Sequence, residues 1–417
     1  MTSDSTLKAT PLGNEIIDRV EALASISESA DGLTRRYLTP EHRRANDLVA
    51  DWMNESGMTV REDAAGNVIG RYPGNSADAP TLMIGSHLDT VVMAGKYDGI
   101  LGVVTGISCV ASLRARGIHL PFAIEVIGFG DEEGARFQST FLGSRAVAGT
   151  FDATLLGRTD ENGITMATAM TAFGLDPNRI GEAAFEPDEL LAYIELHIEQ
   201  GPILEEQVLA VGAVSAIAGA ERFVVTVTGL AGHAGTVPMA LRRDALLAAA
   251  ECSLVVEKFP AKRPGVVGTV GRFDVSPGAT NVIPGQVTFT VDLRAADDRD
   301  RIEVAEEIQN HWREIAARRD VELNTEVVHT ASSVHCAPHI CRQIAAAVGR
   351  EEGRALELTS GAGHDAAAMA SITDVGMIFV RCTGGISHHP DEMITAADAS
   401  AGARVLLDVI ENLEFET

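Results

Sequence analysis

Short apolar runs alternate with helical patterns through the first half of the chain. The runs Thr81–His87 (TLMIGSH) and Phe122–Gly130 (FAIEVIGFG) are typical of buried strands. The threonine–proline pair at 39–40 indicates a helix N-terminus and predicts a helix to about residue 53, and a second helix is expected over Gly99–Arg116. Strands separated by helices predict an α/β fold whose mixed, partly parallel sheet is flanked by helices.

Polar residues follow the predicted strands directly. The segment His87–Asp98 follows the first run and Asp131–Glu133 follows the second. Near the C-terminus, the apolar run Val375–Cys382 continues into TGGISHHPDE. Because α/β sheets hold ligands beyond the carboxyl ends of their strands, we expect these three segments to meet at one edge.

The pattern changes between residues 216 and 329. The segments FVVTVTG (Phe223–Gly229) and QVTFTVDLR (Gln286–Arg294) alternate apolar and polar residues, as in a sheet with one exposed face. Helices are expected over Leu241–Lys258 and Asp300–Arg318. We therefore predict a first domain formed by residues 1–215 and 330–417, interrupted by a smaller α+β domain at 216–329.

Composition limits the class of protein. A chain of 417 residues exceeds what one core usually serves, which favours two domains. Its 33 basic and 59 acidic residues give a net charge of -26, which argues against a nucleic-acid or membrane partner. No apolar run approaches the roughly 20 residues of a membrane span, and the N-terminus lacks a secretory signal pattern. Five scattered cysteines fit reduced thiols in a cytoplasmic protein.

The first third of the chain carries residues suited to a two-metal hydrolytic site. A metal pair lowers the pKa of bound water to about 7 and polarises a carbonyl oxygen. Asp98, in KYDG, is a good bridging carboxylate, because one carboxylate can ligate two cations about 3.5 to 4 Å apart. His87, in GSHLDT, would bind one metal, and Asp89 would orient its imidazole.

The adjacent acids of GDEEG are expected to divide the work. Glu133 would ligate a metal, and Glu132 would be the general base that passes a proton from water to the leaving nitrogen. A solvated acidic turn is the alternative interpretation of DEEG alone. Further ligands are expected from HIEQG (His197–Gly201) and SHHP (Ser387–Pro390), where histidines lie beside glycine, proline and polar residues.

A second metal site is an alternative interpretation of one short segment. His335, Cys336, His339 and Cys341 lie within seven residues. The segment lacks the paired CxxC spacing of a structural zinc site, and CAPHICRQIAAAVGR is typical of an amphipathic helix. The helix is therefore the favoured prediction.

Taken together, the motifs resemble the M20 metallopeptidase family, specifically its carbamoylase branch of N-carbamoyl-L-amino-acid hydrolases, β-ureidopropionases and allantoate amidohydrolases. The resemblance covers nearly the whole chain and keeps the order of the family's motifs. These motifs are GSHLDT, GKYDGILGV, DEEGARF, HIEQGP, AGHAGT, ATNVIPG, DLR, SGAGHDA and GGISHHPDE. The resemblance implies a dinuclear catalytic domain interrupted by a lid and dimerisation domain, and hence a homodimer.

Carried over by position, the resemblance implies roles for eleven residues. The metal ligands would be His87, Asp98, Glu133, His197 and His388, with Asp98 bridging and Glu132 as base. His388 is preferred to His389, because the ligand directly follows the serine of the ISH motif. Substrate would be bound by Gln200, His233, Asn281, Arg294 and the backbone at Gly363. His233 would stabilise the oxyanion, and Arg294 would bind a carboxylate unless it only forms a salt bridge with Asp292.

The expected reaction is hydrolysis of a terminal ureido group on a small carboxylate-bearing substrate, releasing ammonia and carbon dioxide. Three strings look closest to allantoate amidohydrolases, namely DEEGARFQSTFLGSRAVAG, HAGTVPMALRRDAL and GMIFVRCTGGISH. The alternatives are an N-carbamoyl-L-amino-acid hydrolase and, more distantly, an M20 peptidase or aminoacylase. A catalytically silent metal-binding scaffold is disfavoured by Glu132. The ligand set suits two divalent ions, manganese or zinc, with cobalt or nickel as further candidates.

Overall fold

The computed structural model describes residues 11–415, and these residues fold into two compact units. The larger unit comprises the chain up to residue 215 together with residues 336–358 and those from 363 onward. The smaller unit comprises residues 216–335 and 359–362. Most of the N-terminal segment used to argue against a secretory signal lies outside the described residues. The assignment of the smaller unit as a lid or dimerisation domain stays a prediction.

The main sheet is mixed, as predicted. Its strands are ordered β1-β2-β4-β3-β5-β15-β6-β13, where β13 is the two-residue strand Val334–His335, and β14 also pairs with β6. The four central strands β4, β3, β5 and β15 are parallel to one another, whereas β2 runs antiparallel to β4 and β6 runs antiparallel to β15. The strands span β1 (Thr59–Glu62), β2 (Val68–Tyr72), β3 (Thr81–His87), β4 (Ala123–Phe129), β5 (Leu190–Ile198), β6 (Val211–Ile217), β14 (Glu357–Ser360) and β15 (Val375–Val380).

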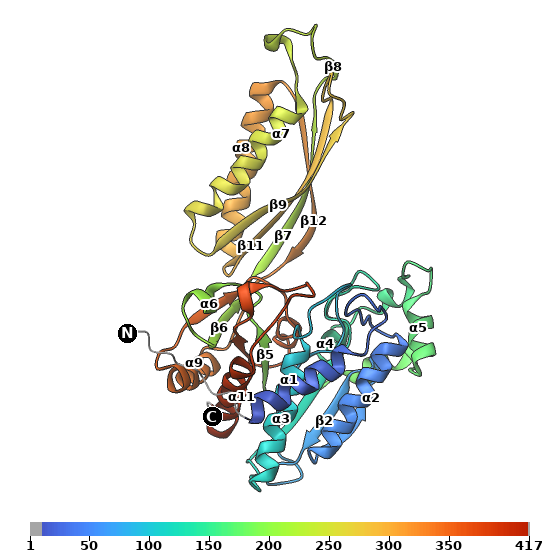
Figure 1. Ribbon diagram of the computed structural model, residues 1–417. Helices are drawn as coiled ribbons and strands as arrows, with labels where there is room; N and C mark the ends of the chain where they lie inside the picture. Colours follow the sequence, from blue (N-terminus) through green and yellow to red (C-terminus); the bar gives the residue numbers. More distant parts are fainter. Residues whose placement is uncertain (1–10, 416–417) are drawn as a thin grey trace. The chain divides into compact units, whose positions relative to one another are not determined.

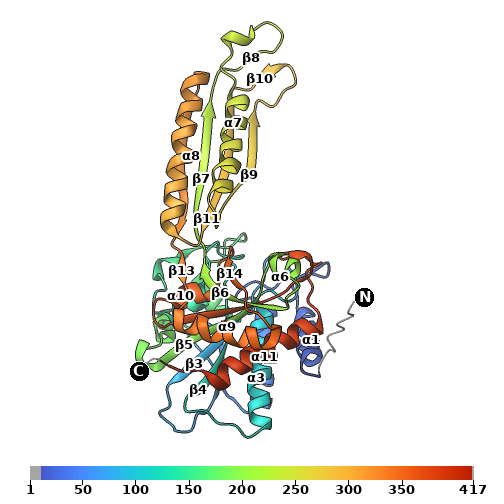
Figure 2. The ribbon, with the colours of Figure 1, turned by 90° about the vertical axis from the view of Figure 1, so that its left-hand side faces the viewer.

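Helices pack against this sheet. Helices α1, α3 and α11 pack against one another, and α9 lies beside α11 (Figures 1 and 2). Thr39 caps α2 by accepting the backbone N–H of His42, so the predicted helix start is confirmed. The helices of this unit are α1 (Pro11–Ala24), α2 (Pro40–Glu55), α3 (Ile100–Ala115), α4 (Leu142–Val147), α5 (Met166–Phe173), α6 (Ile203–Glu206), α9 (Pro338–Glu352), α10 (Asp365–Met369) and α11 (Ala396–Asn412).

The alternation of side chains along β5 gives the sheet two different faces. Ile194 and Leu196 point into the apolar core that α1, α3 and α11 cover. Glu195 and His197 alternate with them, and Glu195 accepts the backbone N–H of Ala366 at the start of α10. The polar side chains therefore lie on the face opposite the main apolar core.

The smaller unit contains a four-stranded antiparallel sheet in the order β12-β7-β11-β9 and a two-stranded ribbon of β8 and β10. Helices α7 and α8 pack side by side against the four-stranded sheet (Figures 1 and 2), and Trp312 of α8 is fully buried in their shared core. The elements are β7 (Gly219–Thr228), β8 (Gly232–His233), α7 (Ala245–Lys258), β9 (Val266–Ser276), β10 (Val282–Ile283), β11 (Gln286–Ala295), α8 (Asp298–Arg319), β12 (Glu322–Ala331) and β13 (Val334–His335).

These observations confirm the predicted α/β class. No helix within residues 11–415 is long and apolar enough to cross a membrane. The location of the protein in the cell stays a prediction.

Candidate active site

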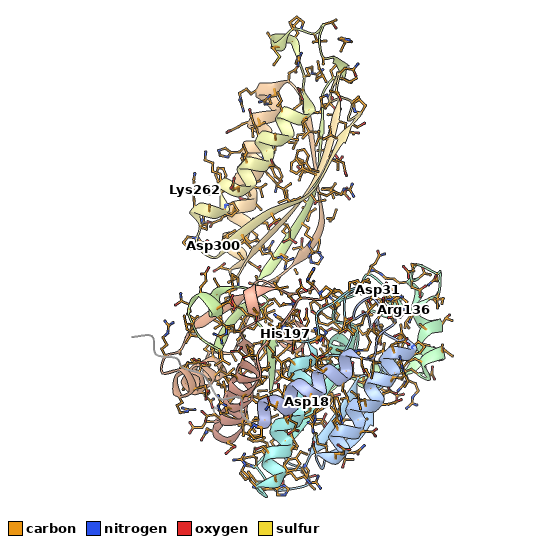
Figure 3. All side chains as sticks on the ribbon, in the orientation of Figure 1. Asp18, Asp31, Arg136, His197, Lys262 and Asp300 are labelled. Carbon is orange, nitrogen blue, oxygen red and sulfur yellow. The ribbon has the colours of Figure 1, made fainter. Side chains whose placement is uncertain are left out.

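The carboxyl ends of the parallel strands bring together residues that are far apart in the sequence. His87 is the last residue of β3, and His197 lies near the end of β5, in the interior of the larger unit (Figure 3). The segment after β4 supplies Glu132 and Glu133, and the loop after β15 supplies His388. Asp98 lies just before α3, in the loop that follows β3.

Asp98 is shared by two groups of side chains able to hold a metal ion. Its Oδ1 lies 3.1 Å from His197 Nε2 and 3.6 Å from His87 Nε2. Its Oδ2 lies 3.2 Å from His388 Nε2, which is 3.4 Å from Glu133 Oε1. One oxygen of the buried carboxylate therefore faces each group, the arrangement that a bridging carboxylate requires.

The imidazoles of His87 and His197 are held in the tautomer that a metal ligand needs. His87 Nδ1 lies 3.0 Å from the backbone oxygen of Asp89, and His197 Nδ1 lies 2.9 Å from that of Ile198. Each Nδ1 therefore carries a hydrogen and donates it, so Nε2 is the nitrogen that faces Asp98 and could bind a metal. At His197, the backbone N–H of Gly99 also lies 3.1 Å from Nε2.

Electrostatics also fit a bound cation. Burial disfavours charge on His87, but Asp98, Glu132 and Asp89 outweigh this and raise its pKa well above the ordinary value. Burial alone would raise the pKa of Asp98, yet hydrogen bonds with His197, His388 and His87 hold it well below its usual range. Without a metal, protons on the imidazoles supply the positive charge that the carboxylates attract. The donor set of histidines and carboxylates suits a divalent ion in their place.

Glycine is required next to the bridging carboxylate. Gly99 has φ +71°, and a Cβ atom there would lie 2.5 Å from the ring of His87. A larger residue would therefore displace a candidate ligand.

Asp89 holds the GDEEG turn with its carboxylate. Its Oδ1 accepts the backbone N–H of Glu132 at 3.0 Å, and its Oδ2 accepts that of Glu133 at 3.3 Å. The carboxylate lies 3.6 Å from His87 Nδ1, so the hydrogen bond to that imidazole is made by the Asp89 carbonyl. Glu132 is buried, which raises its pKa well above the ordinary value despite the opposing effect of His87.

Two predicted substrate-binding residues of the larger unit lie at this cluster. Gln200 Nε2 donates to Asp98 Oδ2 at 2.8 Å and to Ser387 Oγ at 3.0 Å. A Cβ atom at Gly363 would lie 3.8 Å from Glu132 Oε1.

The other three belong to the smaller unit. His233 lies in β8 and pairs with Val282 of β10, and Asn281 directly precedes β10, where its carbonyl accepts the backbone N–H of Ala234. His233 Nδ1 accepts the N–H of Gly235, so the neutral ring carries its hydrogen on Nε2. The guanidinium of Arg294 forms a bidentate pair with Asp292, at 2.8 and 3.0 Å, and donates to the carbonyl of Gly361.

Further residues that were left without a role, or were not singled out, also lie at the cluster. The ring of His364 packs edge-on against His197, with centroids 4.5 Å apart, and burial lowers its pKa well below the ordinary value. Ser387 and Glu392 contact the Asp98 loop. The sequence feature that could have identified Ser387 and Glu392 is their place in the same GGISHHPDE motif as His388. His389 points elsewhere: its Nδ1 accepts the N–H of Asp391, and it belongs to none of the candidate ligand groups found among the described residues.

The Cys/His segment that suggested a second metal site runs into α9, as favoured: His339 and Cys341 lie in its first turns, whereas His335 belongs to β13 and Cys336 precedes the helix. Within residues 11–415, every group of histidine, cysteine and acidic side chains close enough to hold a metal belongs to the cluster around Asp98 and Glu133. A hydrogen bond with Cys341, together with burial, raises the pKa of the Cys336 thiol.

Comparison with known proteins agrees with these motifs. The model of peptidase family M20/M25/M40 matches residues 83–412. N-carbamoyl-L-amino acid amidohydrolase of Geobacillus stearothermophilus is 43% identical over 96% of this chain and 98% of its own. Allantoate deiminase of Arabidopsis thaliana is 39% identical over 96% of this chain and 82% of its own. A hydantoinase/carbamoylase family amidase from Burkholderia multivorans has a TM-score of 0.91 at 35% identity, over 95% of this chain and 97% of its own. The chain is therefore a hydrolase that belongs to peptidase family M20/M25/M40, in its hydantoinase/carbamoylase branch.

Proposed function

We propose that this protein is a two-metal amidohydrolase that cleaves the terminal C–N bond of a ureido group on a small carboxylate-bearing substrate. The observation that carries the proposal is the position of Asp98, whose two carboxylate oxygens each face a separate group of candidate ligands. His87 and His197 would hold one ion, Glu133 and His388 the other, and Asp98 both.

Divalent ions at these positions supply Lewis acidity, which polarises the ureido carbonyl and makes water a stronger acid. Glu132 belongs to neither of the two groups that share Asp98, although it could form a third group with His87 and Glu133. We propose that it stays unbound and accepts a proton. It takes one proton from the attacking water as the new C–O bond forms, and the carbonyl oxygen becomes negative. When the C–N bond breaks, Glu132 returns the proton to the leaving nitrogen. Ammonia departs, and the remaining carbamate loses carbon dioxide.

Five further residues would bind the substrate. We propose that Arg294 binds the substrate carboxylate, because its planar guanidinium is already oriented by Asp292 and only three of its five N–H groups are used in the bonds described above. His233 would donate its Nε2–H to the developing oxyanion, and Asn281, which directly precedes β10, would add a polar contact. Gln200 and the backbone at Gly363 would bind the substrate beside Glu132 and Asp98.

Within this class we favour allantoate, on the three strings that resemble allantoate amidohydrolases. An N-carbamoyl-L-amino acid is the second candidate, and it is favoured by the 43% identity to the enzyme of Geobacillus stearothermophilus. We propose manganese or zinc as the metals and a homodimer as the assembly.

The test is release of ammonia by the metal-reconstituted protein across a panel of ureido acids, with kcat/KM compared between allantoate and N-carbamoyl-L-amino acids. Cleavage of allantoate at the higher kcat/KM is expected. Failure to cleave it, with turnover of the carbamoyl amino acids, would refute the substrate preference alone. Absence of turnover on every ureido acid would refute the reaction.

The role of Glu132 has a separate test. Glu132→Gln keeps the shape of the side chain but removes the proton acceptor, so turnover should be abolished while bound metal is retained. Glu125→Gln is the matched control, because Glu125 is also buried but pairs with Arg61 and Arg71 instead. Unchanged turnover in Glu132→Gln would remove it as the base.

A further inference from the structure

A carboxylate from the C-terminal segment reaches the loop that carries Asp98. Glu392 is only 3% exposed. Its Oε1 accepts the backbone N–H groups of Tyr97 at 2.8 Å and Asp98 at 3.1 Å. Its Oε2 accepts the hydroxyl of Ser387 at 2.9 Å. One side chain thus joins two loops whose contacting residues are nearly 300 positions apart in the sequence.

These bonds act on both sides of the candidate metal centre. The N–H of Asp98 belongs to the bridging residue itself, and Ser387 directly precedes His388. The hydroxyl of Ser387 also lies 3.1 Å from Asp98 Oδ2 and accepts a bond from Gln200. A shift of Glu392 would therefore move both Asp98 and the segment that carries His388.

The three donors to Glu392 are uncharged. A carboxylate is costly to bury unless its oxygens are hydrogen-bonded, and bonds from neutral donors to a charged acceptor are stronger and more directional than those to a neutral one. These three hydrogen bonds therefore hold the backbone of the two loops in place, and they are not ion pairs.

Gly95 provides independent evidence that Glu392 must pack closely against this loop. A Cβ atom at residue 95 would lie 2.1 Å from Cδ and 2.2 Å from Oε1 of Glu392. The backbone of Gly95 has no positive φ, so alanine would fit its conformation. The glycine is therefore needed for the close approach of Glu392.

We infer that Glu392 is a positioning residue of the metal centre, which holds the Asp98 loop against the Ser387–His388 loop so that one oxygen of Asp98 faces each ligand group. The inference rests on the two-metal site proposed above. Groups that orient metal ligands from behind typically change metal affinity or activity by about 10- to 100-fold when they are removed.

The test is a calorimetric titration of chelator-treated, full-length protein with Mn²⁺. Glu392→Met removes the acceptors at similar length and should weaken Mn²⁺ binding by about 10- to 100-fold. Glu392→Gln keeps one acceptor oxygen and should lose less. Gly95→Ala leaves the carboxylate in the chain but displaces it, and should weaken binding in the same direction as Glu392→Met.

Glu125→Met is the matched control, since Glu125 is also 3% exposed and lies in β4 away from the ligand groups. It should lower thermal stability while Mn²⁺ affinity stays that of the wild type. Wild-type affinity in both Glu392→Met and Gly95→Ala would overturn the inference alone. Equal loss of affinity in Glu125→Met would also overturn it, because general destabilisation would then explain the effect. A wild-type protein that binds neither Mn²⁺ nor, in a parallel titration, Zn²⁺ would overturn the two-metal site, and this inference with it.

Discussion

Replacement of Asp89 by asparagine should lower kcat strongly while it changes the stability of the fold only slightly. The wild-type carboxylate is fully buried and accepts the N–H groups of both Glu132 and Glu133. Asparagine keeps one acceptor oxygen, but its NH₂ group would face the other N–H, so two donors would oppose each other. The GDEEG turn would then lose one bond to a charged acceptor and shift.

The magnitude follows from that single bond. A hydrogen bond to a charged group contributes about 1.5–3 kcal/mol. If this energy is needed to hold Glu132 in its working position, kcat should fall by about 10- to 100-fold, at about 1.4 kcal/mol for each factor of ten.

Stability should change much less than activity. Burial, with His87 opposing and Glu133 adding to it, raises the pKa of Asp89 to about 6. A raised pKa means that the folded protein favours the uncharged form, so at pH 7 the charge itself destabilises the fold. Asparagine removes that charge, which offsets the lost hydrogen bond. The free energy of unfolding should therefore change by no more than about 1 kcal/mol, which for a chain of this length shifts the melting temperature by about 1 to 2 °C.

The assay is steady-state ammonia release at saturating metal, with thermal unfolding followed on the same samples. Asp398→Asn is the control, because Asp398 is a buried carboxylate that completes the cap of α11 outside the ligand groups. It should lower the melting temperature and leave kcat unchanged. A kcat within twofold of the wild type in Asp89→Asn, or a loss of activity explained by an unfolded fraction, would refute the reasoning.

Three further predictions concern the metal, the fold and the glycine before α3. Removing the metal with a chelator should abolish hydrolysis and lower the melting temperature, since an ion at 100 times its Kd stabilises by about 2.7 kcal/mol; a melting temperature that does not respond to added metal would contradict this. Gly99→Ala should reduce bound metal and kcat by at least about tenfold, because the new Cβ atom would clash with the ring of His87. Full metal content in elemental analysis of this variant would contradict the prediction. Burial lowers the pKa of His42 from 6.5 to about 3. Below pH 6.5 the unfolded chain therefore binds a proton that the folded protein does not. The free energy of unfolding should fall by about 1.4 kcal/mol for each pH unit between 6.5 and 3, and this loss is absent above pH 6.5. Urea unfolding from pH 7 to pH 5 should show a weaker pH dependence in His42→Gln, and an identical slope would exclude this role for His42.

Much of the fold was predictable because it depends on local pattern. The threonine cap of α2, the buried strands β3 and β4, and the alternating strands β7 and β11 were each expected within a few residues of their observed bounds. These elements are set by periodicity and capping, which act over a few positions along the chain.

The orientation of site residues was less predictable. Asp89 was expected to orient His87, but the sequence did not indicate which of its atoms would do so. In the structure the Asp89 carbonyl forms that bond, and the carboxylate holds the GDEEG turn. The place of Glu392 in the GGISHHPDE string did not indicate its role, because its partners Tyr97 and Asp98 lie nearly 300 residues away. Such bonds depend on which loops meet in space.

The sequence by itself determined the residue types and the strand ends that carry them: histidines and carboxylates placed directly after apolar runs, in the order of the M20 motifs. Only the tertiary structure decided how they combine. Parallel pairing of β4, β3, β5 and β15 brings the strand ends to one edge, and the position of Asp98 there turns one oxygen toward His87 and His197 and the other toward Glu133 and His388. The physical reason is that secondary structure follows from neighbours in sequence, whereas a ligand cluster follows from long-range pairing and packing that no local pattern encodes.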